Sequence, residues 1–232
     1  MKKIVSCIVL ITFLASCSKQ KTGSMVVNGN IDGLKKGTIY LQKIKDTLLI
    51  SVDSVQLNGN SNFVLVDDLT DPEMYYITLD KKENEKIEFF GEKGEITVNS
   101  KLEKLTTSVK ISGSKNQELL DQYYDMIQQF RGKELDFMKS KFEAQRDNND
   151  TLFLNLQKEE ASLIKRKYYY TTNFAIQNND KEVAPYIALR ELYNANIKLL
   201  DTVNSSLSSE IKISKYGKKL NEFIISIKEN EN

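Results

Sequence analysis

The pattern of apolar residues changes its period once along this chain, at Ser114. Before Ser114, apolar and polar side chains alternate in short runs, and in one of them Ile39, Leu41 and, less clearly, Lys43 share one side. Alternation with a period of two is typical of strands that bury one face. After Ser114, apolar residues recur every three or four positions, which is typical of amphipathic helices. The sequence therefore predicts a β-rich region followed by a helical one.

The region 25–113 reads as short strands separated by turns. The turn pairs Asp32-Gly33, Asn58-Gly59 and Lys93-Gly94 fall between apolar runs, where a hairpin needs a residue with positive φ. Short antiparallel strands at this spacing indicate a sandwich or a barrel, and we favour an antiparallel β-sandwich. The expected strands are Met25–Ile31, Thr38–Ile44, Leu48–Leu57, Asn62–Val66, Tyr75–Leu79, Lys86–Phe90, Glu95–Val98 and Val109–Ser112.

The region 114–228 is expected to form a helical module that contains a long helical hairpin. Ser114 with Gln117 makes a capping box, and the apolar residues that follow occupy one arc of about 120° on a helical wheel. The polar run 146–150 predicts the turn, with Asp150 as the cap of the second helix. Further helices are expected at about 181–194, 196–207 and 214–228, before a polar tail at 229–232. The expected fold class is α+β.

The first residues resemble a bacterial lipoprotein signal peptide. Lys2 and Lys3 precede an apolar run, Ile4–Leu14, that is too short to span a bilayer as a helix. Small residues then lead to Cys17, as in a lipobox. The alternatives are a plain secretory signal cut nearby, or an N-terminal anchor helix.

The lipobox resemblance implies that residues 1–16 are removed and that Cys17 carries a diacylglycerol and an amide-linked fatty acid such as palmitate. Residues 17–24 would then form a short polar tether. Ser18, rather than an aspartate, follows the cysteine. By resemblance to lipoprotein sorting, we therefore expect a lipid-anchored protein of the cell envelope, in the outer membrane and facing the periplasm.

Composition narrows the possible chemistry. The chain has no histidine, which removes Ser-His and Cys-His catalysis and imidazole metal ligands. Cys7 lies in the expected signal peptide, so Cys17 is the only later cysteine. The formal net charge of +1 gives no general attraction for nucleic acid. We expect no catalytic residues, no metal site and no cofactor, and we expect the acidic cluster Asp67, Asp68 and Asp71 to be solvated.

Several runs in the β-rich region and the helices resemble a domain of unknown function in envelope lipoproteins. That domain commonly precedes a thioredoxin-like module in AhpC/TSA-type thiol-disulfide oxidoreductases. The resemblance implies the accessory region of such proteins without the redox module, because no Cys-x-x-Cys occurs in the 232 residues. The matching runs are Val27–Leu34, Gly37–Leu41, Val52–Val55, Pro72–Tyr76, Phe89–Val98, Ile111–Ser114 and Ser214–Leu220.

These observations favour a non-enzymatic, membrane-anchored lipoprotein that acts as a protein-interaction or accessory module. Its partners would be the membrane, through the lipid on Cys17, and another envelope protein. The partner-binding surface is expected on the helical module at Tyr124, Tyr168 and Tyr169, which lie at or beyond the edges of the apolar stripes, as Phe142 does. The alternative is that these side chains pack within the fold. Two other functions stay open, namely a small ligand held between sheet and helices, and a hydrolase without a recognisable motif.

Overall fold

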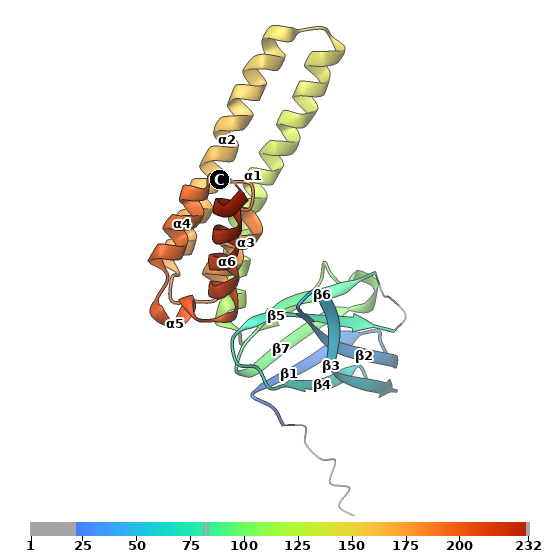
Figure 1. Ribbon diagram of the computed structural model, residues 1–232. Helices are drawn as coiled ribbons and strands as arrows, with labels where there is room; N and C mark the ends of the chain where they lie inside the picture. Colours follow the sequence, from blue (N-terminus) through green and yellow to red (C-terminus); the bar gives the residue numbers. More distant parts are fainter. Residues whose placement is uncertain (1–21, 81, 83, 231–232) are drawn as a thin grey trace, which may run out of the picture.

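The computed structural model describes residues 22–80, 82 and 84–230 (Figure 1). The expected signal peptide, Cys17 and most of the expected tether lie outside the described residues. The described chain folds as predicted, with two four-stranded sheets first and a helical module after them. The strands are β1 (Met25–Asp32), β2 (Lys36–Lys45), β3 (Leu48–Asn58), β4 (Asn62–Asp67), β5 (Glu73–Leu79), β6 (Lys86–Gly91), β7 (Gly94–Lys101) and β8 (Lys110–Ser112).

The two sheets form the layers of a sandwich. Sheet A has the strand order β4-β1-β7-β8, and sheet B has the order β3-β2-β5-β6. The strand pairs are antiparallel as predicted, with the exception of β1 and β7, which run parallel. Alternation tells which face of a strand is buried, but it carries no information on the direction of the neighbouring strand.

The predicted turns are where the glycines were expected. Gly33, Gly59 and Gly94 have φ values of +87°, +90° and +115°, a region that side chains with a Cβ rarely adopt. Between β2 and β3, Asp46 takes the left-handed conformation with φ of 57°, which aspartate tolerates better than most residues. These local preferences set the ends of the strands.

The core of the sandwich lies between the two sheets and joins inward side chains of both, such as Val27 and Ile96 with Ile39 and Ile77. Strand β5 is different, because all its residues are buried. On its outer side Met74 packs with α1, α3 and α6, which explains why an apolar residue stands there.

The helical module begins at a predicted cap. The hydroxyl of Ser114 accepts a hydrogen bond from the backbone N–H of Gln117 at 3.1 Å. The helices are α1 (Lys115–Arg146), α2 (Asp150–Gln177), α3 (Val183–Glu191), α4 (Ile197–Ser206), α5 (Ser209–Lys212) and α6 (Lys215–Asn230). A short 3₁₀ turn, η1 (Leu102–Lys104), precedes β8.

The cap of α2 was predicted one residue too late. Asn149, not Asp150, accepts from the backbone N–H of Leu152, at 3.1 Å. Asn148 makes the reversal with a φ of 53°, so Asp150 is already the first helical residue. Aspartate and asparagine have nearly equal preference for the cap, and the backbone of the turn decides between them.

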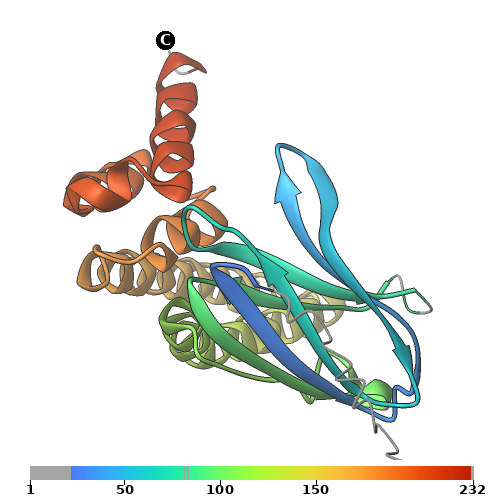
Figure 2. The same cartoon turned by 90° about the horizontal axis from the view of Figure 1, so that it is seen from below.

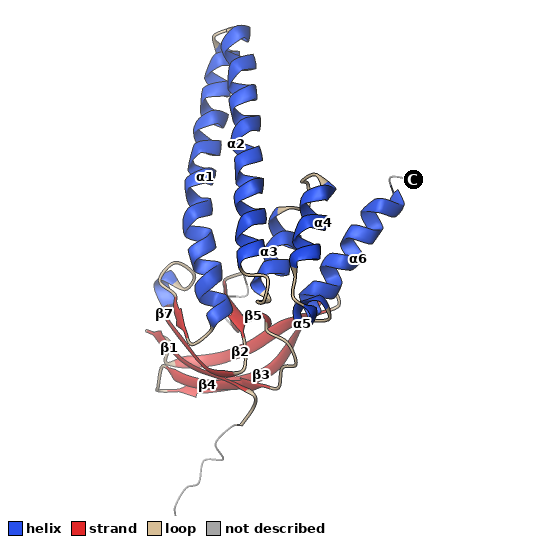
Figure 3. Ribbon diagram, turned by 90° about the vertical axis from the view of Figure 1, so that its left-hand side faces the viewer, coloured by secondary structure: helices blue, strands red, loops and turns tan. Residues whose placement is uncertain are grey.

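Helices α1 and α2 form the predicted hairpin, which stands on the sandwich, while α3 and α4 pack beside its lower half and α6 packs on α3 and α4 (Figure 3). Sheet B is the layer nearer to the helices. Sheet A faces the other way, and Figure 2 shows the sandwich from that side, with β1 in front of the helices. The described chain enters the sandwich on the side opposite the hairpin tip (Figure 1).

Candidate functional site

The first kind of site considered in the described residues is a metal site. No group of three or more histidine, cysteine, aspartate or glutamate side chains is placed to hold an ion in the described part of the chain. Among the helices of residues 22–230 that the structure describes, none is long and apolar enough to cross a bilayer. The candidate binding sites in the described residues are therefore sought in cavities and on exposed surfaces.

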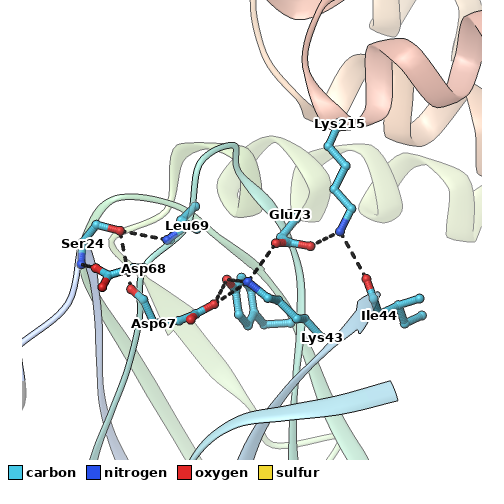
Figure 4. A network of polar contacts seen from close by, with 9 residues as sticks. Ser24, Lys43, Ile44, Asp67, Asp68, Leu69, Glu73 and Lys215 are labelled. Atoms are coloured by element: carbon cyan, nitrogen blue, oxygen red, sulfur yellow. Dashed lines mark hydrogen bonds and ion pairs between the residues drawn. The ribbon is translucent and has the colours of Figure 1, made fainter. Parts of the chain in front are cut away.

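The contact between sandwich and helices, which we call the junction, is held by a chain of charged groups (Figure 4). Glu73 on β5 pairs with Lys43 on β2 at 3.3 Å and with Lys215 at the start of α6. Lys43 also binds Asp67 at 2.6 Å. Burial lowers the pKa of Lys43, but the two carboxylates raise it more, so this lysine stays charged. The junction thus ties strands of both sheets to α6.

The acidic cluster at the end of β4 was expected to be solvated, and the structure confirms this for Asp68, which is exposed, whereas Asp67 and Asp71 are half-buried. Asp67 binds Lys43, Asp68 accepts from the backbone N–H of Ser24 at 2.8 Å, and Asp71 accepts from that of Lys215 at 3.1 Å. The partners are far away in sequence, so only the tertiary fold brings them to the loop. These carboxylates have structural roles.

Two buried hydrogen bonds complete the junction. The hydroxyl of Tyr216 accepts a hydrogen bond from the backbone N–H of Met74 at 3.0 Å. The side-chain oxygen of Gln117 accepts one from the backbone N–H of Phe90 at 2.7 Å. Gln117 was predicted to close a capping box, but its side-chain oxygen reaches the sandwich instead. Met74 and Phe90, paired across β5 and β6, pack in one cluster with α1, α3 and α6.

The junction also contains a buried carboxyl group. Glu182 is 2% exposed, and its Oε2 has no hydrogen-bond partner among the described residues. Burial raises the pKa of Glu182 to about 7. The residue borders a cavity of about 370 Å³ whose other walls include Asp71, Glu92 and Ser214.

The predicted partner residue Tyr124 lies in a cleft of about 210 Å³ whose walls come from β5 and β6 of sheet B, the β8 segment, and helices α1 and α3. Its ring packs against Tyr123 with 5.6 Å between centroids, and the guanidinium groups of Arg131 and Arg190 lie 5.7 and 5.9 Å from its centroid. Arg190 donates to the hydroxyl of Tyr186, another lining residue, at 2.9 Å. Burial raises the pKa of Tyr124, as expected for a half-buried phenol.

The other two predicted tyrosines lie elsewhere. Tyr168 and Tyr169 line a cavity of about 470 Å³ between α2 and the start of α4. Tyr168 is half-buried and packs on the core of the helical module, whereas Tyr169 is 49% exposed and has Lys165 5.8 Å from its ring. The structure therefore brings Tyr168 and Tyr169 together and places Tyr124 in a separate cleft.

The largest exposed apolar side chains of α1 form a surface that the sequence did not single out. Leu135, Met138 and Phe142 are 64%, 63% and 68% exposed, and their spacing of three and four places them on one face of α1. We call these three residues the distal stripe. The sequence places Phe142 at or beyond the edge of the predicted apolar stripe. The spacing was visible in the sequence, but the absence of a covering element was not.

These features define an α+β protein with a two-sheet sandwich that supports a helical hairpin. Residues 25–120 match a sequence family described as a domain of unknown function (DUF4369). The match covers the sandwich and the first residues of α1, and it confirms the expected domain of unknown function over that range. Neither the curated proteins nor the solved structures include a match to this chain.

Proposed function

We propose that this protein is a non-enzymatic lipoprotein of the cell envelope that is anchored through Cys17 and binds a protein partner with its helical hairpin. The observation that carries the proposal is the distal stripe. Three large apolar side chains, each more than 60% exposed, lie together where no described element covers them. Exposed apolar groups of this kind mark interaction surfaces.

The direction of the hairpin supports the same function. Helix α1 has 32 residues, which corresponds to about 48 Å at 1.5 Å per residue. The described chain enters the sandwich on the side opposite the hairpin tip (Figure 1). A lipid on Cys17 would therefore hold the sandwich near the membrane and point the hairpin away from it. In the outer membrane, the tip would face the periplasm.

The resemblance to the accessory region of thiol-disulfide oxidoreductases fits a role without catalysis of its own. The 232 residues contain no Cys-x-x-Cys, and dithiol exchange needs an attacking and a resolving thiol. We expect the purified chain not to reduce insulin disulfides above background. Turnover that persists in Cys17→Ser would contradict the accessory role.

The experiment that tests the partner surface is photo-crosslinking in the native envelope from a probe at Lys139, an exposed position beside the distal stripe. Leu135→Ser, Met138→Ser and Phe142→Ser together should abolish the crosslinks and leave the thermal midpoint unchanged, because these side chains lie largely in water. Ile213→Ser is a matched control, since Ile213 is also 68% exposed but lies between α5 and α6. Crosslinks that survive the triple substitution would refute the proposal.

The tyrosines test how far the surface extends. We expect Tyr169→Ser and Tyr168→Ser to weaken the crosslinks if the partner also covers the cavity between α2 and α4. Tyr124→Ser is expected to act through stability, because its ring packs against Tyr123 and has two guanidinium groups within 6 Å of its centroid. Loss of crosslinks in Tyr124→Ser at unchanged stability would place the partner over the Tyr124 cleft as well.

A small-ligand-binding lipoprotein is the second candidate, and the Tyr124 cleft favours it. The cleft lies between sheet and helices, and its lining combines the apolar side chains of Met74 and Leu120 with the guanidinium of Arg190 and the carboxyl groups of Glu88 and Asp121. Such a lining suits a small molecule that carries both an anionic and a cationic group. A rise in thermal midpoint with a free amino acid such as phenylalanine that is lost in Arg190→Ala would support this function.

A further inference from the structure

The outer face of sheet A carries an unusual set of side chains. The sheet register aligns Asn62 on β4, Asn30 on β1 and Asn99 on β7 in one row. The next row on the same face holds Asn28 between Val64 and Thr97. We call the four asparagines the carboxamide face. Neighbouring strands lie about 4.8 Å apart, so a row presents its amides at nearly regular spacing.

These asparagines run against the preference of the strands that hold them. Asparagine is depleted in strands, where threonine or valine packs better on a pleated surface. Asn30 donates to Asn62 at 2.6 Å. Within the described residues, no hydrogen bond engages the side-chain amide of Asn28 or Asn99. Residues that disfavour the local secondary structure are often found at functional sites. Asparagines on the exposed face of a strand therefore indicate a binding site.

The same face borders an open groove of about 910 Å³. Val26, Val55 and Val64 supply apolar patches, and Thr22 and Thr97 supply hydroxyl groups. Glu95 is the only charged residue among those that line the groove. A nearly neutral groove offers no charge to attract nucleic acid or a charged peptide, and it matches an uncharged, strongly polar ligand.

We propose that the carboxamide face binds a neutral carbohydrate chain. Each carboxamide offers two N–H donors and a carbonyl acceptor, so it can serve neighbouring hydroxyl groups of a sugar that both donate and accept. The valines can contact the C–H faces of the sugar rings. The face belongs to the sheet that looks away from the helices, so this binding is independent of the partner proposed for the hairpin (Figure 2).

The test is calorimetric titration of the full chain in mild detergent with neutral hexasaccharides of β-1,4-glucose, β-1,4-N-acetylglucosamine and α-mannose. We expect at least one of them to bind at concentrations up to the millimolar range. The double variant Asn28→Thr with Asn99→Thr should weaken that binding by about tenfold or more, because it removes two amide partners.

The thermal midpoint separates binding from a structural role. Because threonine suits strands better than asparagine, the double variant should melt at the same or a higher temperature. Gln56→Thr is the matched control, since Gln56 is an exposed strand residue of sheet B, and it should bind as the unchanged chain does. The proposal is overturned if none of the hexasaccharides binds, if the double variant binds equally well, or if its midpoint falls together with the binding.

Discussion

The lower and upper halves of helix α1 carry similar apolar stripes but have opposite environments. In the lower half, Leu120, Tyr123 and Ile127 are at most 3% exposed, because the sandwich, α2 and α3 cover them. In the upper half, the distal stripe is more than 60% exposed. There the two helices of the hairpin are joined by ion pairs such as Lys141 with Glu160 at 2.5 Å. Apolar residues at helical spacing therefore show a face, and the rest of the fold decides whether that face is core or surface.

The largest effect expected from this contrast is on stability. Tyr123→Ala should lower the free energy of unfolding by about 3–5 kcal/mol, because Tyr123 is fully buried and its hydroxyl bonds Thr171 at 2.7 Å. Phe142→Ala, in the upper half, should change it by less than about 0.5 kcal/mol. Urea denaturation measures both. Similar losses in the two variants would show that the upper half is also packed.

The charged junction should give the next largest effect. Glu73→Ala leaves Lys43 and Lys215 without their shared carboxylate in a partly buried site, so it should lower the free energy of unfolding by roughly 2–3 kcal/mol. The control is Glu118→Ala, which removes an exposed pair with Lys115 and should cost less than about 0.5 kcal/mol. If the two variants are equally stable, the junction does not hold the module in place.

A pH-dependent effect is expected from Glu182. Its pKa is raised from 4.5 to about 7 in the folded protein, so the folded state binds more protons than the unfolded chain between these values. The contribution of Glu182 to the free energy of unfolding is therefore fully present below about pH 4.5 and is lost as the pH rises through 7. Glutamine is neutral at every pH. Between pH 5 and pH 8, Glu182→Gln should therefore lose roughly 2 kcal/mol less free energy of unfolding than the unchanged protein does. Parallel pH profiles for both proteins would disprove this assignment.

The smallest effect on stability is expected at Tyr169. Because Tyr169 is half-exposed, Tyr169→Ser should shift the free energy of unfolding by no more than about 0.5 kcal/mol. Tyr124→Ser should cost clearly more, about 1–2 kcal/mol, since its ring packs on Tyr123. Thermal melts of the two variants compare a hairpin surface directly with the junction. Equal melts would mean that both tyrosines are surface residues.

Several features of the sites were accessible from sequence and others were not. Asn28 and Asn30 alternate with Val27 and Ile31 in the sequence, but they were not singled out as candidate site residues. That Asn62 and Asn99 join them depends on which strands are neighbours, and the β1–β7 pair proved to be parallel. Likewise, Tyr168 and Tyr169 are adjacent in sequence, but the cavity beside them exists only because α4 begins there.

The sequence by itself determined the local structure of this protein. Alternation set the strands, glycines with positive φ set the turns, and the hydroxyl of Ser114 set the start of α1. These outcomes depend on neighbours a few residues apart, which a sequence contains. Only the tertiary structure decided that Asp67 meets Lys43, that Glu182 is buried, and that the distal stripe stays uncovered. Those outcomes depend on groups distant along the chain, whose positions follow from how the sheets and helices pack together.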